Sequence, residues 1–163
     1  AARQSLHDNL EAVVVLPGDM PNVTPQIINK LVLRQHETGA SVVVATTTVP
    51  NFSGSFAGFK DFGRVVRDSR GELIKIIEAK DAAPLEKEIT ELNTGFFCFR
   101  ADWLWKNLSG VENKNIQGEY YVTDLVSLAF QSNERVASII VEPRAALGVN
   151  TKEQLASLHN FKV

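Results

Sequence analysis

Runs of apolar residues alternate with polar stretches along the chain in a way that predicts alternating strands and helices. The apolar run Ala12 to Leu16 predicts a strand that is buried on both faces. Apolar positions at helical spacing then predict a helix that begins after Thr24-Pro25 and stops at Gly39. Because a strand rich in β-branched residues follows over Ser41 to Val49, this strand–helix–strand unit predicts a sheet that is at least partly parallel.

The remaining pattern continues in the same way, without a linker or an internal repeat. Further strands are expected over Phe62 to Arg67, Leu73 to Ala79, Leu92 to Arg100 and Arg135 to Val141. Helices are expected over Ala1 to Asn9, Asp81 to Thr90 with an interruption at Pro84, Ala101 to Leu108, Tyr121 to Phe130, and Thr151 to about Leu158. The glycine- and phenylalanine-containing stretch Pro50 to Asp61 reads as a mobile loop. One α/β domain over residues 1–163 accounts for the whole pattern.

Composition narrows the class of protein. The chain has 163 residues, of which 44% are hydrophobic, enough for one domain with a core. A net charge of −2 does not indicate a nucleic-acid-binding surface, and the three histidines are not spaced as zinc ligands usually are. The single cysteine, Cys98, sits in an apolar run and is expected to be a reduced core residue. No apolar run has membrane-spanning length and no signal-peptide pattern is seen, so the expected compartment is the cytoplasm.

The first strand ends in a group that can carry chemistry. Pro17-Gly18 terminates the run, and Asp19 stands alone at the strand's carboxyl end. Ligands of open α/β sheets bind at that position, and a lone carboxylate there suits Mg²⁺ shared with substrate phosphates. The alternative is that Gly18-Asp19 is only turn chemistry.

Four further stretches hold candidate functional residues, and each has a purely structural alternative. Gly63 in FGR is either a bulge or a close backbone approach to a ligand with a free N–H. Glu78 in IIEAKDA either pairs with Lys80 or accepts hydrogen bonds from sugar hydroxyls. Asn93 in ELNTG places an amide at the entry to a buried strand, where it needs partners. The stretch GEYYVTD, Gly118 to Asp124, gathers tyrosines, a threonine and two carboxylates before an apolar helix.

Taken together and in this order, LPGDMP, FGR, IEAKDA, ELNTG, QGEYYVTD and GVN closely resemble the uridylyltransferase domain of bacterial N-acetylglucosamine-1-phosphate uridylyltransferases. The resemblance runs from about Ala12 to Leu155, and QGEYYVTD and ELNTG are its specific parts. In that family the domain usually forms the first half of a bifunctional enzyme that is also a glucosamine-1-phosphate acetyltransferase. The resemblance implies a Rossmann-like α/β fold with a mixed, mostly parallel sheet of the nucleotide-diphospho-sugar transferase type.

The resemblance also implies roles for individual residues. Asp19 and Asn150 match the two residues that hold the catalytic Mg²⁺ in the family. The pocket for the N-acetylglucosamine moiety is matched by four residues, with Tyr121 beside them: Gly63, Glu78, Asn93 and Thr123. Two departures stand out. Pro17 occupies a position where the family often has tyrosine, and the loop Phe52 to Asp61 is longer than usual.

The implied reaction is a Mg²⁺-dependent uridylyl transfer that makes UDP-N-acetylglucosamine, a peptidoglycan precursor. A phosphate oxygen of N-acetylglucosamine-1-phosphate attacks the α-phosphorus of UTP, and pyrophosphate leaves. Positioning and charge neutralisation suffice for this step, which agrees with a sequence that shows no Ser-His or Cys-His arrangement. Two alternatives stay open: a pyrophosphorylase for another sugar phosphate or nucleotide, and a non-catalytic sugar-phosphate-binding fragment.

Two family segments have no counterpart here: the first strand with its glycine-rich triphosphate loop, and the segment that reads the uracil base. The resemblance therefore predicts the carboxyl-side part of the domain, without its first strands and about 80 upstream residues. The chain alone is then expected to be inactive. The open edge of Ala12 to Leu16 would pair with the missing segment or with a second copy. The sequence up to Val163 contains no acetyltransferase repeats, so the acetyltransferase half is expected to be absent from this chain, and the resemblance allows a trimer for the full-length bifunctional enzyme.

Overall fold

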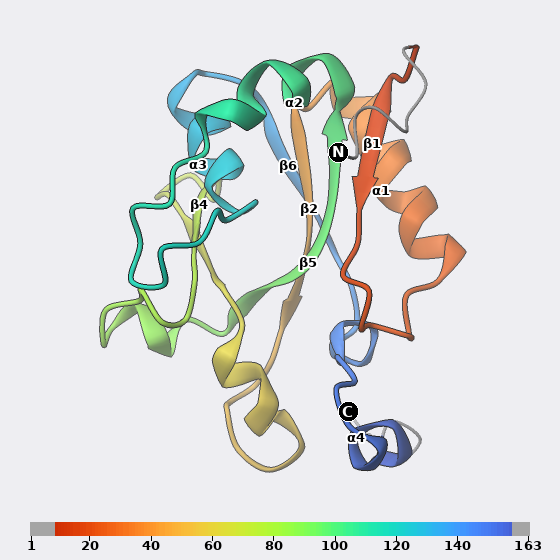
Figure 1. Ribbon diagram of the computed structural model, residues 1–163, viewed down its shortest axis with the longest axis vertical. Helices are drawn as coiled ribbons and strands as arrows, with labels where there is room; N and C mark the ends of the chain where they lie inside the picture. Colours follow the sequence, from red (N-terminus) through yellow and green to blue (C-terminus); the bar gives the residue numbers. More distant parts are fainter. Residues whose placement is uncertain (1–8, 158–163) are drawn as a thin grey trace.

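A computed structural model describes residues 9–157 of the chain (Figure 1). The strands are β1 (Ala12–Val15), β2 (Val42–Thr48), β3 (Arg64–Arg67), β4 (Leu73–Ile77), β5 (Glu91–Arg100) and β6 (Val136–Ile140). The α-helices are α1 (Pro25–Thr38), α2 (Ala101–Asn107), α3 (Asp124–Gln131) and α4 (Lys152–Ser157). Short 3-10 helices are η2 (Gly54–Asp61), η3 (Glu86–Glu88), η4 (Leu108–Gly110) and η5 (Pro143–Ala146). The helix expected over Ala1 to Asn9 lies, except for its last residue, outside the described residues.

Helix α1 begins and ends where its sequence signals predict. The hydroxyl of Thr24 accepts a hydrogen bond from the Ile27 N–H at 3.4 Å, and Pro25 occupies the first turn. Gly39 closes the helix with φ of 62°, a left-handed conformation in which its N–H donates to the Gln35 carbonyl at 2.8 Å. Leu31, on the inner face, is fully buried against the sheet.

Strand β5 is the central strand of the sheet, and it runs antiparallel to its neighbours. The strand order is β4-β3-β5-β2-β6, and β1 also pairs with β5. Because β5 is antiparallel to β1, β2 and β3, the only parallel pair among the described strands is β2 with β6. The mixed α/β sheet is therefore confirmed, but the expectation of a mostly parallel sheet is wrong. The β1–α1–β2 crossover makes β1 and β2 parallel to each other, yet β5 lies between them.

Strand β1 lies at a border of the sheet. Within residues 9–157 it pairs with β5 alone, through Ala12 opposite Arg100 to Val15 opposite Phe97. All four of its residues are only partly buried, so the predicted burial on both faces is wrong. A border strand has a neighbour on one side only, and this position explains the difference.

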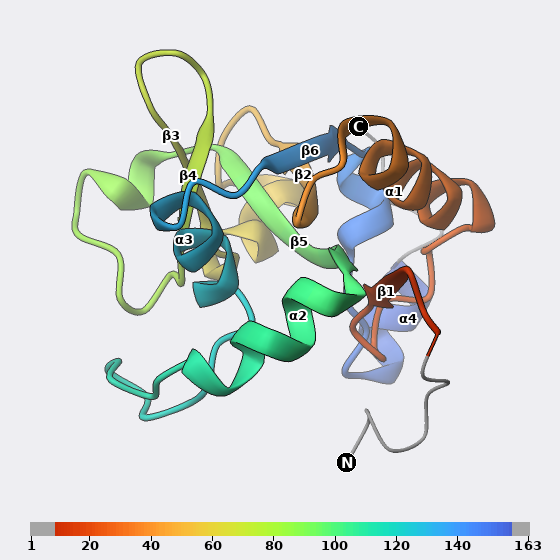
Figure 2. The same ribbon diagram turned by 90° about the horizontal axis from the view of Figure 1, so that it is seen from above.

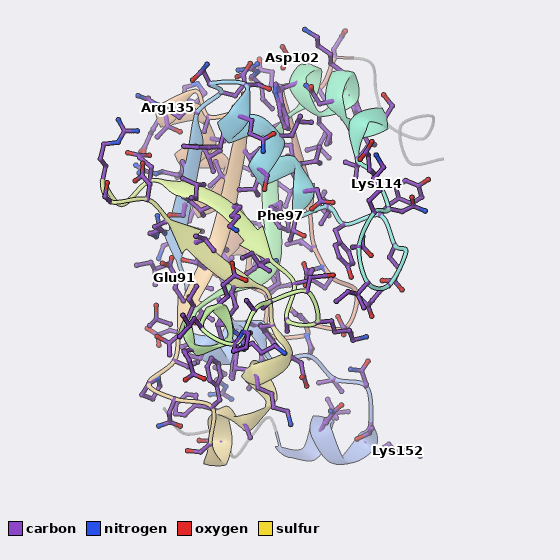
Figure 3. All side chains as sticks on the ribbon, turned by 90° about the vertical axis from the view of Figure 1, so that its left-hand side faces the viewer. Glu91, Phe97, Asp102, Lys114, Arg135 and Lys152 are labelled. Carbon is purple, nitrogen blue, oxygen red and sulfur yellow. The ribbon has the colours of Figure 1, made fainter. Side chains whose placement is uncertain are left out.

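The core has two layers, one on each face of the sheet. Successive β2 side chains alternate, so that Val42 and Val44 face α2, α3 and the β3–β4 hairpin, whereas Val43 and Ala45 face α1. Figure 2 shows α1 on one side of the sheet and α2 and α3 on the other. Phe97 lies in the first layer, in the interior of the molecule (Figure 3). Cys98 is buried in the second layer as a free cysteine, as expected.

Two stretches differ from the sequence-based expectation. The predicted loop over Pro50 to Asp61 contains η2, because Phe59 inserts into a small aromatic cluster and draws the chain into helical turns. The predicted helix over Asp81 to Thr90 is reduced to η3, because Pro84 removes a backbone donor from its first half. Within residues 9–157, none of the helices has the length and apolar character needed to cross a membrane.

Candidate functional site

The carboxylate of Glu78 is the centre of a polar cluster at the end of β4. The hydroxyl of Thr123, at the start of α3, donates to Glu78 Oε1 at 2.9 Å. Gly63 lies against the same carboxylate: a Cβ built on it would sit 3.0 Å from Ile76 Cγ2 and 3.4 Å from Glu78 Oε2. Glycine is therefore the residue that lets the backbone approach so closely. We call Gly63, Glu78, Asn93 and Thr123 the Glu78 cluster.

Asn93 joins this cluster through the backbone. Its N–H donates to the Gly63 carbonyl at 2.9 Å, and its side-chain oxygen accepts from the Gly95 N–H at 3.0 Å. The side chain is nearly buried, with 9% of the residue exposed. Its amide nitrogen has no hydrogen-bond partner among the described residues, so a donor is left for a ligand. The structure thus brings together the four residues that the sequence placed in one pocket.

The cluster is acidic. Burial raises the pKa of Glu78, the Thr123 hydroxyl opposes this shift, and the nearby Asp81 and Asp124 add to it. Burial and Asp81 likewise raise the pKa of Asp124. The alternative pairing of Glu78 with Lys80 is wrong, because the Lys80 ammonium donates to the Gln117 side chain instead. No cation pairs with Glu78 in the part of the chain that the structure describes, which leaves the carboxylate as a hydrogen-bond acceptor.

Tyr121 borders the cluster rather than belonging to it. Its hydroxyl accepts a hydrogen bond from the Gln117 side chain at 2.6 Å. That bond lowers the pKa of Tyr121, but burial and the negative charges of Asp81 and Glu78 outweigh it and raise the pKa overall. Gln117 contacts both Tyr121 and Lys80 and orients them. The sequence analysis did not single out Gln117, although it is the first residue of the motif QGEYYVTD.

Asp19 and the Gly148–Asn150 loop meet from opposite ends of the chain. The Val149 N–H donates to the Asp19 carbonyl at 2.8 Å. A Cβ on Gly148 would lie 3.3 Å from Asp19 Oδ2, so this glycine makes room for the carboxylate. Asp19 and Asn150 are both exposed. Carboxylate and amide oxygens of the kind that these two residues carry suit a hard cation that keeps waters or substrate oxygens. No group of three or more His, Cys, Asp or Glu that could hold a metal gathers in residues 9–157.

Gly95 connects the two parts of the site. Its N–H bonds to Asn93 of the Glu78 cluster, and its φ is +79°. A Cβ on Gly95 would lie 2.9 Å from Pro17 Cγ, two residues before Asp19. The Asp19 turn therefore rests on β5 directly beside the strand residue that carries the Asn93 amide. Pro17, the departure noted in the sequence, is the residue that makes this contact.

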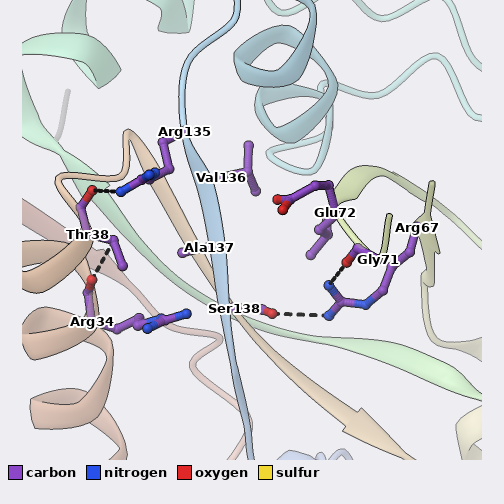
Figure 4. A pocket seen from close by; sticks show the side chains of 10 residues that line it. Arg34, Thr38, Arg67, Gly71, Glu72, Arg135, Val136, Ala137 and Ser138 are labelled. Carbon is purple, nitrogen blue, oxygen red and sulfur yellow. Dashed lines mark hydrogen bonds between the residues drawn. The ribbon is translucent and has the colours of Figure 1, made fainter. Parts of the chain in front are cut away.

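A cavity of about 410 Å³ at the free edge of β6 lies elsewhere and holds none of the predicted site residues (Figure 4). Three arginines contribute to its lining: Arg34, Arg67 and Arg135. Two of them have structural partners: Arg67 binds Glu91 at 2.6 and 2.8 Å, and Arg135 donates to the Thr38 carbonyl at 2.9 Å. Figure 3 shows Arg135 and Lys152, which follows Asn150, at opposite ends of the molecule. This cavity is therefore separate from the candidate site.

Comparison with known proteins finds relatives whose sequences are similar to this one. The chain is 37% identical over 156 residues to the bifunctional protein GlmU of Desulfotalea psychrophila, covering 95% of this chain and 44% of that protein. It is 37% identical over 157 residues to bifunctional protein GlmU of Brevibacillus brevis, covering 96% of this chain and 32% of that protein. The GlmU protein of Pelotomaculum thermopropionicum is 39% identical over 150 residues, which are 91% of this chain and 31% of that protein. The chain thus spans less than half the length of these relatives.

A solved structure shows the fold. CMP:2-keto-3-deoxy-manno-octonic acid synthetase complexed with CTP matches 98% of this chain and 64% of its own, with a TM-score of 0.61 and 16% identity. The chain therefore shares a mixed α/β fold with this synthetase. No family model matches the sequence.

Proposed function

The chain is homologous to a segment of the bifunctional GlmU proteins, and from this premise we propose that it is part of a sugar-1-phosphate nucleotidyltransferase. The specific reaction that we propose is uridylyl transfer from UTP to N-acetylglucosamine-1-phosphate, giving UDP-N-acetylglucosamine and pyrophosphate. The observation that carries the proposal is the Glu78 cluster: Gly63 just before β3, Glu78 just after β4, Asn93 of β5 and Thr123 just before α3 lie together with unused polar groups. Such convergent polar groups are what orient a small polar ligand.

In this proposal the Glu78 cluster binds the sugar. Glu78 accepts hydrogen bonds from sugar hydroxyls, because its carboxylate has no cation partner among the described residues. The side-chain amide of Asn93 donates to a sugar oxygen from a nearly buried position. Tyr121 limits the pocket on the side of α3, held by Gln117. These contacts would fix the phosphate of the sugar toward the Asp19 end of the sheet, since Gly95 and Pro17 join the two parts.

Asp19 and Asn150 would hold Mg²⁺. The fit is supported by the approach of the two loops, which leaves space for the Asp19 carboxylate only because residue 148 is glycine. When bound, the ion would supply charge neutralisation for the phosphates of both substrates. The chemical step is the attack of a phosphate oxygen of the sugar phosphate on the α-phosphorus of UTP. The bond from that phosphorus to the β-phosphate oxygen breaks, and pyrophosphate leaves with its electron pair.

The test is to measure binding and turnover separately. We expect N-acetylglucosamine-1-phosphate to bind in titration calorimetry, and glucose-1-phosphate, which lacks the acetamido group, to bind more weakly. Turnover of N-acetylglucosamine-1-phosphate and UTP to UDP-N-acetylglucosamine in the presence of Mg²⁺ would be measured by the release of pyrophosphate. Equal affinity for the two sugars would favour a pyrophosphorylase of different specificity. Sugar binding without turnover in the full-length protein would favour the binding-module alternative, and no binding of either sugar phosphate would contradict the proposal.

A further inference from the structure

Arg64, the first residue of β3, is a buried arginine whose hydrogen bonds all go to backbone carbonyls. It is 2% exposed. Its Nε donates to the Lys87 carbonyl at 3.2 Å, Nη2 donates to the Lys60 carbonyl at 2.8 Å, and Nη1 donates to the Phe62 carbonyl. The guanidinium also lies over the ring of Phe52, with Cζ 4.7 Å from the ring centroid.

A structural role in a sheet would look different, as the neighbouring Arg67 shows. Arg67 lies three residues further along β3 and forms a two-pronged ion pair with Glu91 across the strands. Arg64 makes no ion pair with any described residue, although Asp61 and Glu88 are close enough to affect its charge. Burying a guanidinium costs free energy, so its donors must be satisfied. Here the carbonyls of Lys60 and Phe62, which precede Gly63, and of Lys87 in η3 satisfy them.

One of these bonds fixes the peptide that leads into Gly63. The peptide is trans, so the Phe62 carbonyl and the Gly63 N–H point in opposite directions. Because the carbonyl is held by Arg64, the Gly63 N–H is directed away from the guanidinium. That N–H has no acceptor among the described residues, while the Gly63 carbonyl is taken by Asn93. Gly63 also lies against the Glu78 carboxylate, so its N–H is a donor at the border of the Glu78 cluster.

We propose that Arg64 is a positioning residue that holds the Phe62–Gly63 peptide so that the Gly63 N–H donates to an acceptor oxygen of the bound sugar phosphate. This inference rests on the proposed function. Arg64 does not touch the ligand; it acts through the peptide that its guanidinium holds. The planar fork of arginine reaches three carbonyls on two segments at once, whereas a lysine ammonium on its flexible stem cannot span them in one fixed geometry.

The experiment compares Arg64→Lys with Arg67→Lys, a matched change on the same strand. Both variants lose a hydrogen-bonded guanidinium fork, so both should melt at a lower temperature than the unsubstituted protein. We expect Arg64→Lys alone to weaken N-acetylglucosamine-1-phosphate binding, by about tenfold, because one ligand donor is no longer oriented. In the full-length protein, affinity for UTP should not change in either variant. Unchanged sugar-phosphate affinity in Arg64→Lys, or equal weakening in Arg67→Lys, would overturn the proposal.

A second readout keeps this inference separate from the proposed function. In ¹H–¹⁵N spectra of the unliganded protein, the Gly63 amide resonance should shift and exchange faster with solvent in Arg64→Lys, and stay unchanged in Arg67→Lys. If the unsubstituted protein binds no sugar phosphate, the proposed function fails, and this amide comparison still decides whether Arg64 holds the peptide. If Arg64→Lys does not fold, Phe52→Leu, which removes the ring under the guanidinium, should weaken sugar binding in the same direction; wild-type affinity in that variant would contradict the inference.

Discussion

At the residue scale, Glu78 is a carboxylate that the fold keeps partly out of water without giving it a cation among the described residues. Its pKa is raised above the ordinary value of 4.5, first by burial. The stability that goes with a raised pKa is fully present below the unfolded value and is lost as pH rises through the folded value. Wherever Glu78 is ionised, its charge therefore destabilises the folded protein, which is typical of groups kept for function.

The substitution Glu78→Gln should consequently raise the free energy of unfolding at pH 7 by roughly 1 kcal/mol, the usual scale of one substitution. The Gln amide oxygen can still accept from Thr123, so the local bond is kept. The gain should vanish near pH 4, where Glu78 is protonated. Urea unfolding at the two pH values measures this, with Glu37→Gln on the exposed face of α1 as control. A gain that is the same at both pH values would contradict the assignment of the raised pKa to Glu78.

Gly63 gives a second prediction at this scale. Gly63→Ala places a methyl 3.0 Å from Ile76 Cγ2 and 3.4 Å from Glu78 Oε2. Either the Ile76 side chain or the Glu78 carboxylate must move, so sugar-phosphate affinity should fall by about tenfold or more. Calorimetric titration measures the loss. Gly58→Ala in η2 is the matched control, because a Cβ there meets nothing within 4 Å. Equal affinities in the two variants would remove Gly63 from the site.

At the element scale, the junction of β5 with the Asp19 turn depends on a backbone conformation that only glycine adopts readily. Gly95→Ala is strained twice: by φ of +79° and by a methyl 2.9 Å from Pro17 Cγ. We expect a loss of about 2–4 kcal/mol of unfolding free energy. In a Pro17→Ala background the clash is removed but the φ strain stays, so the loss should shrink to about 1–2 kcal/mol. Urea unfolding of this double-mutant cycle checks the partition, and an unchanged loss would show that Pro17 contributes nothing.

The elements themselves show how much a sequence can predict. Helix α1 was predicted within a residue at each end, because its cap, proline and terminal glycine act locally. The place of β5 between β1 and β2 was not predicted, because strand order depends on pairing between residues 43 to 88 positions apart. In the site, the resemblance placed Gly63, Glu78, Asn93 and Thr123 in one pocket, and the structure brings these four residues together, while their binding role stays a prediction. Arg64 and Gln117 were not singled out, because the roles proposed for them rest on hydrogen bonds that sequence spacing does not reveal.

At the scale of the whole molecule, the candidate Mg²⁺ site depends on two loops separated by most of the chain. Asp19 follows β1, Asn150 follows η5, and the bond from Val149 to the Asp19 carbonyl joins them. In the full-length protein we expect Asp19→Asn to lower turnover by orders of magnitude while leaving the melting temperature nearly unchanged, since Asp19 is exposed. Asn150→Ala should lower turnover as well, and the double variant should lose less than the product of the two. Near-normal turnover in Asp19→Asn would remove it from the mechanism.

The central position of β5 has a consequence for how the protein is made. During synthesis β1 and β2 leave the ribosome long before β5, yet neither pairs with the other, because β5 must enter between them. Until β5 has emerged, β1 and β2 lack the strand that lies between them, and the growing chain must carry them without it. The sheet therefore forms late, around its antiparallel strand, and nascent chains that end before β5 are the form of this protein most in need of a chaperone.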